Sequence, residues 1–341
     1  MTAPLIAVTM GDPAGIGPEI ALKAARALAP RISVGAIRLA IVGSVAELAR
    51  TDAALGLGAR LRPGLAPAVW PEIAVIETAP ARMPIAFGAV SGEAGHLAYE
   101  AVATAVRHAL AGDVAAIATA PLNKEALNLG GHRYAGHTDM LADLTGVKDS
   151  CMMLAHGALR VTHVTTHVAL ARVPALLTPE RLDRTLRLTF EALGRLGIAA
   201  PRVAVAALNP HAGEGGLFGT EDDTVTVPVL RDWRARGFKV HGPVPGDTVF
   251  VKAAAGQFDA VVAMYHDQGH IPVKLLGFRI DPASGAMAEL GGVNVTLGLP
   301  IIRTSVDHGT AFDIAGRGIA NPSSMVEAIE FAARLAQGGG G

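Results

Sequence analysis

The chain has 341 residues, of which 50% are hydrophobic and 17% are charged, and its formal net charge is -1. This length is sufficient for two domains with sizeable cores. The near-zero charge argues against nucleic acid or an anionic membrane as a partner, and apolar stretches such as Leu39 to Val42 are far shorter than the roughly 20 residues that cross a bilayer.

The amino terminus has no basic region and continues directly into Leu5-Ile6-Ala7-Val8, which predicts a first strand and not a signal peptide. Cys151 is the single cysteine and lies in an apolar run, so no disulfide can form within the chain. We expect this thiol to be buried and inert. Together these features predict a cytoplasmic protein.

The first part of the chain alternates predicted strands and helices. Strands are expected at residues 5–9, 39–43 and 113–118, and helices at 18–28, 45–55 with Ser44 as the cap, and 92–110. The Gly- and Pro-rich stretch 56–71 predicts a surface connection. Met10 to Gly17 forms a turn that could hold an anion or simply connect strand to helix, because its glycine spacing is not that of a dinucleotide-binding loop.

The segment Gly136-His137-Thr138-Asp139 opens a predicted helix. A ring nitrogen, a hydroxyl group and free helix amides at one place suit a phosphate or carboxylate ligand. A helix cap formed by Thr138 or Asp139, with His137 exposed, fits these residues equally well.

Three histidines follow predicted strands in the second part of the chain. The strands are expected at 160–166, 203–208 and 261–265, and the histidines are His167, His211 and His266. If the strands are parallel neighbours, the three rings converge at one edge of a sheet. Three imidazoles leave coordination positions open on a divalent cation and suit zinc, cobalt or another first-row metal. Asp247 and Asp267 could orient the rings or bind the metal through water.

Helices are also expected from residue 178 or 179, where Leu182, Leu186, Phe190 and Leu193 form an apolar stripe, and at 222–236, 248–255 and 325–336.

The run from His308 to Pro322, which reads HGTAFDIAGRGIANP, resembles the nucleotide loop of the isocitrate and isopropylmalate dehydrogenases. Together with Tyr265-His266-Asp267-Gln268 and Gly136-His137-Thr138-Asp139, it more closely resembles the 4-hydroxythreonine-4-phosphate dehydrogenase family of vitamin B6 (pyridoxine) synthesis. This resemblance extends from the segment GDPAGIGPE at residues 11–19 to Asn321.

The resemblance implies an α/β fold like that of isocitrate and isopropylmalate dehydrogenases, with two α/β/α domains flanking an active-site cleft. We expect residues 1–130 and 294–341 to form the domain with the cofactor loop. Residues 131–293 are expected to form the domain with the metal and substrate groups and the dimer contacts. The resemblance also implies that His167, His211 and His266 bind one divalent metal ion, Zn, Co or Mg, across the interface of an obligate homodimer.

The implied reaction is the oxidation and decarboxylation of a 4-phosphorylated 3-hydroxy acid, with NAD and a divalent metal. Asp247 and Asp267 are the candidates for the general base. NAD is preferred over NADP because no arginine pair is evident near Asp313. The positions that match substrate-binding residues are His137, Thr138, Lys274, Asn294 and Arg303, and those that match cofactor-binding residues are His308, Gly309, Thr310, Ala311, Asp313 and Asn321.

The chain departs from the vitamin B6 enzymes between Arg279 and Gly292, where those enzymes have a shorter link. In this respect it resembles a catabolic branch that oxidises 4-phospho-D-threonate or 4-phospho-D-erythronate. The alternatives of another class are a phosphate-ligand acyltransferase on the same architecture and a metal-dependent hydrolase. Formation of NADH with a divalent metal and each phosphorylated candidate separates a dehydrogenase from both.

Overall fold

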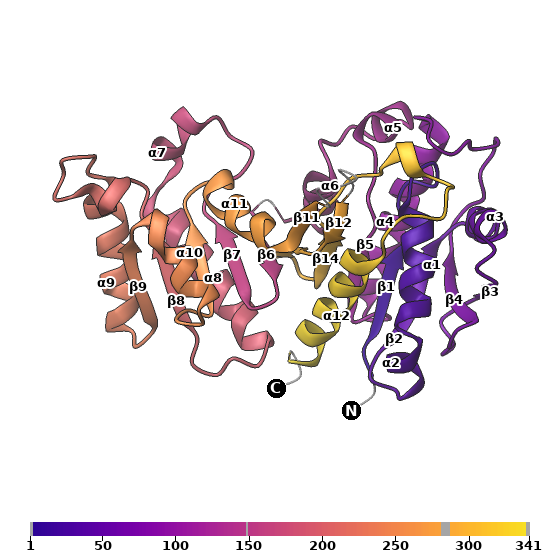
Figure 1. Ribbon diagram of the computed structural model, residues 1–341, viewed down its shortest axis with the longest axis horizontal. Helices are drawn as coiled ribbons and strands as arrows, with labels where there is room; N and C mark the ends of the chain where they lie inside the picture. Colours follow the sequence, from indigo (N-terminus) through magenta and orange to yellow (C-terminus); the bar gives the residue numbers. More distant parts are fainter. Residues whose placement is uncertain (1–2, 148, 281–286, 339–341) are drawn as a thin grey trace. The chain divides into compact units, whose positions relative to one another are not determined.

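The computed structural model describes residues 3–147, 149–280 and 287–338. The described residues up to Ser150 and from Leu299 onward form one compact unit, and those from Cys151 to Gly298 form a second (Figure 1). The segment Asp281 to Gly285, which the sequence predicts to be a turn, lies outside the described residues.

The first unit is built on a sheet whose neighbouring strands run parallel, in the order β3-β4-β2-β1-β5-β14. The strands are β1 (Leu5–Thr9), β2 (Arg38–Gly43), β3 (Arg60–Pro63), β4 (Glu72–Glu77), β5 (Ala116–Thr119) and β14 (Arg303–Val306). β3 lies inside the stretch predicted to be a surface connection, and that prediction is therefore wrong at residues 60–63. The side chains of β3 are half-buried or exposed, and the sequence there therefore lacks the apolar pattern from which a buried strand is predicted.

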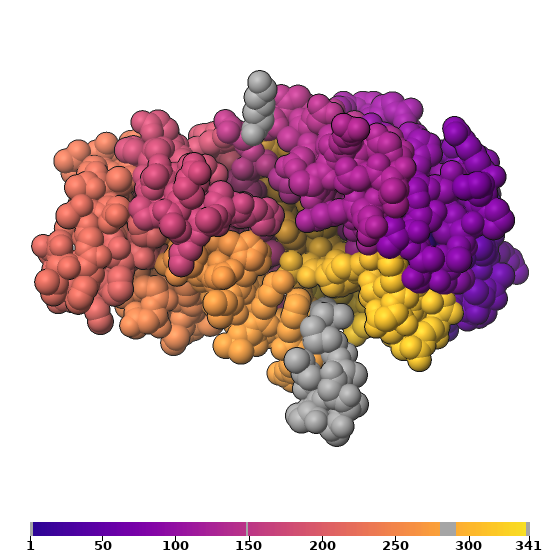
Figure 2. Space-filling view, turned by 90° about the horizontal axis from the view of Figure 1, so that it is seen from above, coloured from indigo at the N-terminus to yellow at the C-terminus, as the bar shows by residue number. Residues whose placement is uncertain are grey.

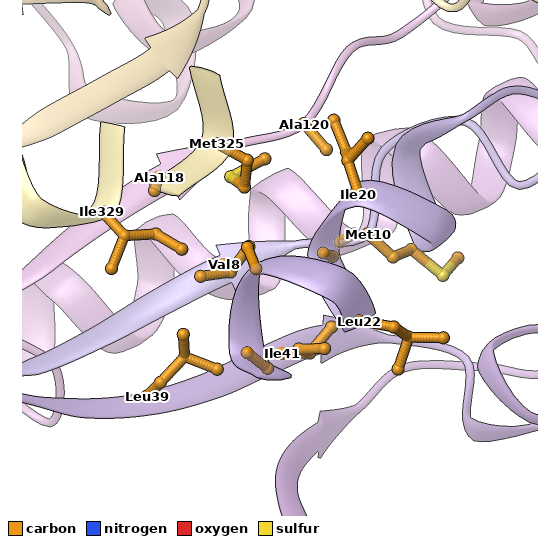
Figure 3. Close-up of a cluster of buried hydrophobic side chains, with 14 of the residues drawn as sticks. Val8, Met10, Ile20, Leu22, Leu39, Ile41, Ala118, Ala120, Met325 and Ile329 are labelled. Atoms are coloured by element: carbon orange, nitrogen blue, oxygen red, sulfur yellow. The ribbon is translucent and has the colours of Figure 1, made fainter. Parts of the chain in front are cut away.

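Both faces of this sheet are covered, which explains why β1 is apolar at every position but the last. Ile6 and Val8 face α1 (Gly17–Ala27) and α12 (Ser323–Gln337), and Figure 3 shows Val8 among Ile20 and Leu22 of α1 and Met325 and Ile329 of α12. Leu5 and Ala7 face the opposite side, where α4 (Gly92–Ala111) packs. The remaining helices of the unit are α2 (Ala29–Ser33), α3 (Val45–Leu55), α5 (Lys124–Leu129), α6 (His137–Thr145) and the short η4 (Phe312–Ile314).

Residues 131–150 lie in the first unit, although we expected them in the other domain. The reason is the packing of α6, whose Met140 and Leu141 are buried in the core beneath α4. Residues 294–298 lie in the second unit because β13 (Val293–Leu297) pairs with β6 (Cys151–His156).

The second unit has a mixed sheet in the order β13-β6-β7-β10-β8-β9. β6 runs antiparallel to β13 and to β7 (Leu159–His163). β10 (Ala260–Ala263) lies between β7 and β8 (Arg202–Ala206) and is parallel to both, and β9 (Lys239–Val244) is parallel to β8. β11 (Phe278–Ile280) and β12 (Met287–Leu290) form a separate antiparallel pair.

Helices also cover both faces of this sheet. α8 (Pro179–Arg195) and α9 (Val227–Ala235) share one core, in which the predicted stripe residues Leu182, Leu186 and Leu193 are buried and Phe190 packs at the edge. α10 (Gly246–Ala254) and α11 (His266–Gly277) share the other. The short elements are η1 (Leu170–Arg172), α7 (Val173–Leu176), η2 (Pro210–Gly213) and η3 (Asp222–Thr226). Within the described residues, no helix is long and apolar enough to span a membrane.

Candidate active site

The three histidines predicted as metal ligands lie beyond the carboxyl ends of adjacent parallel strands. His167 follows β7, His211 follows β8 and His266 begins α11 directly after β10. Because β10 is the parallel neighbour of both β7 and β8, the three loops leave the same edge of the sheet. The expectation that these strands are parallel neighbours is confirmed.

His167 and His266 lie side by side, with their ring centroids 5.6 Å apart. Both line a pocket of about 300 Å³ together with Tyr265 and Asp267. His211 lines a pocket of about 610 Å³, which Asp247, Tyr265 and Asp267 also line. Tyr265 and Asp267 therefore border both pockets. Among the residues that the structure describes, no three His, Cys, Asp or Glu side chains are close enough to hold a metal ion.

The backbone at two of these histidines is held in the left-handed region. φ is 50° at His167 and 51° at His211, and Ala212 and Glu214 beside His211 are also left-handed. Such a conformation is uncommon for residues other than glycine and costs on the order of 1 kcal/mol or more. Backbone strain of this kind concentrates at functional sites, because selection for binding tolerates it there.

His266 is fixed on two sides. Its Nδ1 lies 2.7 Å from Oδ1 of Asp267, and the ring of His270 stacks on it with centroids 3.6 Å apart. The Nδ1 atom of His270 is 2.9 Å from the backbone oxygen of His266. Since Nδ1 of His266 is engaged, its Nε2 is the nitrogen oriented for a ligand.

The row of rings continues to His163, which lies 4.8 Å from His270. Burial, followed by the neighbouring ring of His270, lowers the pKa of His163 to about 3. Burial, followed by His266, lowers the pKa of His270 to about 4, and the Lys274 ammonium contributes to this shift. Both rings are therefore neutral near pH 7, which is the form compatible with a nearby cation. Sequence reasoning missed both, although the spacing of four residues between His266 and His270 on a helix was available.

The other predicted substrate residues of this unit are Lys274 and Asn294. Lys274 lies on α11, two turns after His266, and its Nζ is 5.3 Å from the Phe278 ring centroid. Asn294 is half-buried in β13, opposite Leu154 of β6.

In the first unit, His137 stands at the start of α6. The cap residue is Gly136, without any side-chain hydrogen bond, so the alternative in which Thr138 or Asp139 caps this helix is wrong. Thr138 and Asp139 are exposed residues of the first turn. Nε2 of His137 is closed off from solvent and has no hydrogen-bond partner among the described residues. It is a donor or acceptor available for a ligand.

His137 lines a small pocket of about 90 Å³ together with Thr119, Ser305 and His308. Arg303 is buried beside this pocket, with 3% of its surface exposed, and its Nη2 donates to Oγ1 of Thr119 at 2.7 Å. Burial, followed by the Arg303 charge, holds the pKa of His137 well below its ordinary value. Burial lowers the pKa of Arg303 to about 9, so the guanidinium still carries its charge at pH 7. A buried cation beside a neutral imidazole and two hydroxyl groups suits a small anion.

The predicted cofactor loop follows β14 and is attached to the start of α1. The amide of Ile16 donates to the oxygen of Thr310 at 3.0 Å, and Gly15 lies so close to Thr310 that a side chain there would collide with it. Ala311 is left-handed, with φ 43°. The turn Met10 to Gly17 therefore supports this loop. Its amides bind backbone and Asp12 oxygens, which favours the simple-turn alternative over an anion site.

The individual residues of this loop differ in the contacts that they make. His308 lines the small pocket with His137, so one predicted cofactor residue and one predicted substrate residue meet there. Asp313 lies in η4, where Nη1 of Arg317 approaches its backbone oxygen at 3.5 Å. Oδ1 of Asn321 accepts hydrogen bonds from the amide and hydroxyl of Ser323. The side-chain NH2 group of Asn321 takes no part in these bonds.

Comparisons with known proteins agree on one family. Residues 24–332 match the model of the family described as pyridoxal phosphate biosynthetic protein PdxA. A protein of Bradyrhizobium diazoefficiens, named provisionally as a D-threonate 4-phosphate dehydrogenase, is 60% identical over 99% of this chain and 98% of its own length. The D-threonate 4-phosphate dehydrogenase of Salmonella typhimurium is 46% identical over 98% of this chain and 100% of its own. A crystal structure of 4-hydroxythreonine-4-phosphate dehydrogenase from Klebsiella pneumoniae is 45% identical, with 98% of each chain covered and a TM-score of 0.83.

Proposed function

Because this chain belongs to the PdxA family, we propose that it is a dehydrogenase that oxidises the 3-hydroxyl group of a 4-phosphorylated hydroxy acid. NAD accepts the hydride, and the product loses carbon dioxide. The observation that carries the proposal is the small pocket of the first unit, which His137 and His308 line together with Thr119, the hydroxyl partner of buried Arg303.

The preferred substrate is D-threonate 4-phosphate, with 4-hydroxythreonine 4-phosphate of the vitamin B6 pathway as the alternative. The support is the 60% identity to a relative named for the former compound. The two candidates differ at C2, which carries a hydroxyl group in one and an amino group in the other.

The phosphate of the substrate is assigned to Arg303 and His137. The charged guanidinium and the enclosed Nε2 of His137 supply donors, and the amides of the first turn of α6 add the positive end of the helix dipole. Thr138 in the same turn, Lys274 and Asn294 are proposed to bind the remaining substrate groups.

His167, His211 and His266 are proposed to hold one divalent ion, Zn, Co or Mg. Two of these donors support the proposal within one chain, because His167 and His266 are adjacent and Asp267 lies against Nδ1 of His266, whereas His211 borders the neighbouring pocket and does not complete the set. Such an ion supplies Lewis-acid stabilisation of the charge that develops on the substrate oxygen.

The hydride leaves C3 with its electron pair, and the hydroxyl proton passes to a base. Asp267 is engaged with His266, so we assign orientation of the metal ligand to Asp267 and the base to Asp247, which lines the pocket of His211. The nicotinamide cofactor is assigned to His308, Gly309, Thr310, Ala311, Asp313 and Asn321.

The proposal includes a homodimer with a shared site, and the surface around these histidines supports it. Val251 of α10 and Ile271 and Leu275 of α11 are 70%, 65% and 78% exposed, and Ile271 and Leu275 border the pocket of His211. α11 belongs to the orange part of the surface in Figure 2. These apolar side chains are exposed, and the set of metal ligands within the described part of one chain is incomplete. A partner subunit at this surface would cover the apolar side chains and supply the missing ligands. The enzyme is proposed to work in the cytoplasm, without nucleic-acid or membrane partners.

The test is an NADH absorbance assay with zinc, cobalt or magnesium and three substrates: D-threonate 4-phosphate, D-erythronate 4-phosphate and 4-hydroxythreonine 4-phosphate. We expect NADH and one equivalent of carbon dioxide, with the highest kcat/KM for D-threonate 4-phosphate. Highest activity with the amino compound would reverse the substrate assignment. If no NADH forms with any substrate and metal, the acyltransferase and hydrolase alternatives are favoured.

A further inference from the structure

Helix α1 holds the predicted cofactor loop through one ion pair, Glu19 and Lys23. Nζ of Lys23 donates to Oε1 of Glu19 at 2.7 Å, to the oxygen of Gly318 at 2.8 Å and to the oxygen of Ala320 at 2.9 Å. The amide of Ala320 donates to the same Glu19 oxygen at 2.8 Å. The pair thus binds three backbone polar groups, from Gly318 and Ala320, in a loop that lies about 300 residues away in the sequence.

The burial of this pair distinguishes it from an ordinary helix ion pair. The side chain of Glu19 is 1% exposed and that of Lys23 is 19% exposed. An exposed ion pair between residues four apart stabilises a helix only slightly, and burying charge is costly unless hydrogen bonds satisfy it. Here the loop backbone bonds to Nζ of Lys23 and to Oε1 of Glu19, so the ion pair and the loop conformation depend on each other.

Helix α1 provides a rigid base for this contact. Its Ile20 and Leu22 are fully buried and point into the core (Figure 3). The same end of α1 also holds the first half of the loop through Ile16 and Thr310. Both halves of the segment His308 to Asn321 are therefore attached to one element.

We propose that Glu19 and Lys23 are positioning residues for the nicotinamide cofactor. This inference rests on the proposed function, because it takes residues 308–321 as the cofactor loop. A loop already held in one conformation loses less conformational entropy when it binds the cofactor, so binding is tighter. Asn321, a predicted cofactor-binding residue, follows Ala320 directly. If Ala320 loses its bonds to Glu19 and Lys23, we expect Asn321 to become mobile as well.

The test compares the double variant Glu19→Gln/Lys23→Met with the wild-type dimer. The double substitution removes both charges without leaving one buried alone, and Gln keeps an oxygen for the amide of Ala320. Lys23→Met alone is the second variant. The matched control is Arg31→Met, which removes an ion pair of the same 2.7 Å length between Arg31 and Glu330 that does not touch the loop.

NADH affinity is measured by fluorescence titration, and steady-state kinetics give KM for NAD, KM for substrate and kcat. We expect the double variant to bind NADH about tenfold more weakly, as for the loss of roughly one charge-assisted hydrogen bond. KM for NAD should rise in parallel, while kcat and KM for substrate stay within about twofold. Exchange of the Ala320 amide should also become faster than in Arg31→Met.

Unchanged NADH affinity in a folded double variant would overturn the inference, and so would an equal loss in Arg31→Met. Absence of NADH binding by the wild-type protein would overturn the proposed function and this inference with it. The two failures are distinguishable, because absence of NADH binding is observed in the wild-type protein and failure of the inference alone is observed only in the double variant.

Discussion

At the scale of single residues, the molecule places ionisable groups in positions that cost free energy. Arg303 is a buried cation whose pKa is lowered by burial, and His137 beside it is kept neutral. A polar or charged group is kept in such surroundings where a ligand compensates for the lost water. An incoming phosphate would supply that compensation for Arg303.

Arg303→Met is expected to reduce kcat/KM for the phosphorylated substrate by about 100-fold or more, since loss of one partner of a buried charge pair costs about 2–5 kcal/mol. Steady-state kinetics measures this, together with the concentration of inorganic phosphate that inhibits. Arg62→Met, at a more exposed arginine, should leave both values unchanged. If Arg303→Met retained normal phosphate inhibition, another group would have to bind the phosphate.

Asp12 is a second buried ionisable residue, and it controls a pH dependence of stability. It is fully buried at the end of β1, and burial raises its pKa from 3.8 to about 6, against the opposing hydrogen bond from the amide of Ala14. The folded state therefore binds more protons than the unfolded state between about pH 4 and pH 6. The contribution of Asp12 to the free energy of unfolding must fall as the pH rises through this window.

We expect the free energy of unfolding of the wild type, minus that of Asp12→Asn, to decrease by about 2 kcal/mol between pH 4 and pH 7. Urea denaturation at several pH values measures it, and all other carboxyl groups cancel in the difference. Parallel pH profiles for the two proteins would show that folding does not raise the pKa of Asp12.

At the scale of elements, the loops that follow the strands contain both the candidate site residues and the strained backbone. His167 and His211 are left-handed in loops that follow β7 and β8, and Ala311 is left-handed in the loop that follows β14. Glycine would adopt these angles at a lower cost in free energy. Histidine at two of these positions therefore indicates that the imidazole side chain is needed there.

His167→Gly should therefore be more stable than His167→Ala by about 1 kcal/mol, because only alanine keeps the unfavourable contact of Cβ at positive φ. Both variants should lose metal affinity to the same extent. Urea denaturation of the metal-free proteins and calorimetric titration with zinc measure the two quantities. Equal stability of the two variants would mean that the backbone at this loop is not strained.

At the scale of the whole molecule, the apolar residues exposed on α10 and α11 concern assembly. Leu275 is as exposed as any large apolar residue of the described chain, at 78%. It borders the pocket that contains His211 and Asp247. A second subunit placed there would bury this surface and adjoin the predicted metal ligands.

Leu275→Glu is expected to convert the proposed dimer to monomers and to abolish the proposed metal-dependent activity at the same protein concentrations, since a charge would then have to be buried in the interface. Sedimentation velocity and the NADH assay measure the two effects. Val34→Glu, at a residue of equal exposure in the other unit, should affect neither. An active monomeric variant would contradict the shared site.

Much of the local structure and the family could be predicted from the sequence. β1 occupies the expected residues 5–9, and Ser44 caps α3 through the amide of Glu47. Such features depend on neighbouring residues, and periodicity or a cap signal therefore identifies them. The comparisons confirm the resemblance to the 4-hydroxythreonine-4-phosphate dehydrogenase family, which rested on long contiguous motifs. β4, β6 and β9 were not predicted as strands, since short runs next to glycine and proline carry little periodicity.

Only the tertiary structure decided which of these segments meet. β10 comes after β8 and β9 in the sequence but is inserted between β7 and β8, and this order makes the loops of His167, His211 and His266 neighbours. The row of His270 and His163 beside His266 and the contact of Lys23 with Ala320 were equally absent from the sequence reasoning. Each arises from packing between residues far apart in the chain, and local periodicity contains no information on such pairs.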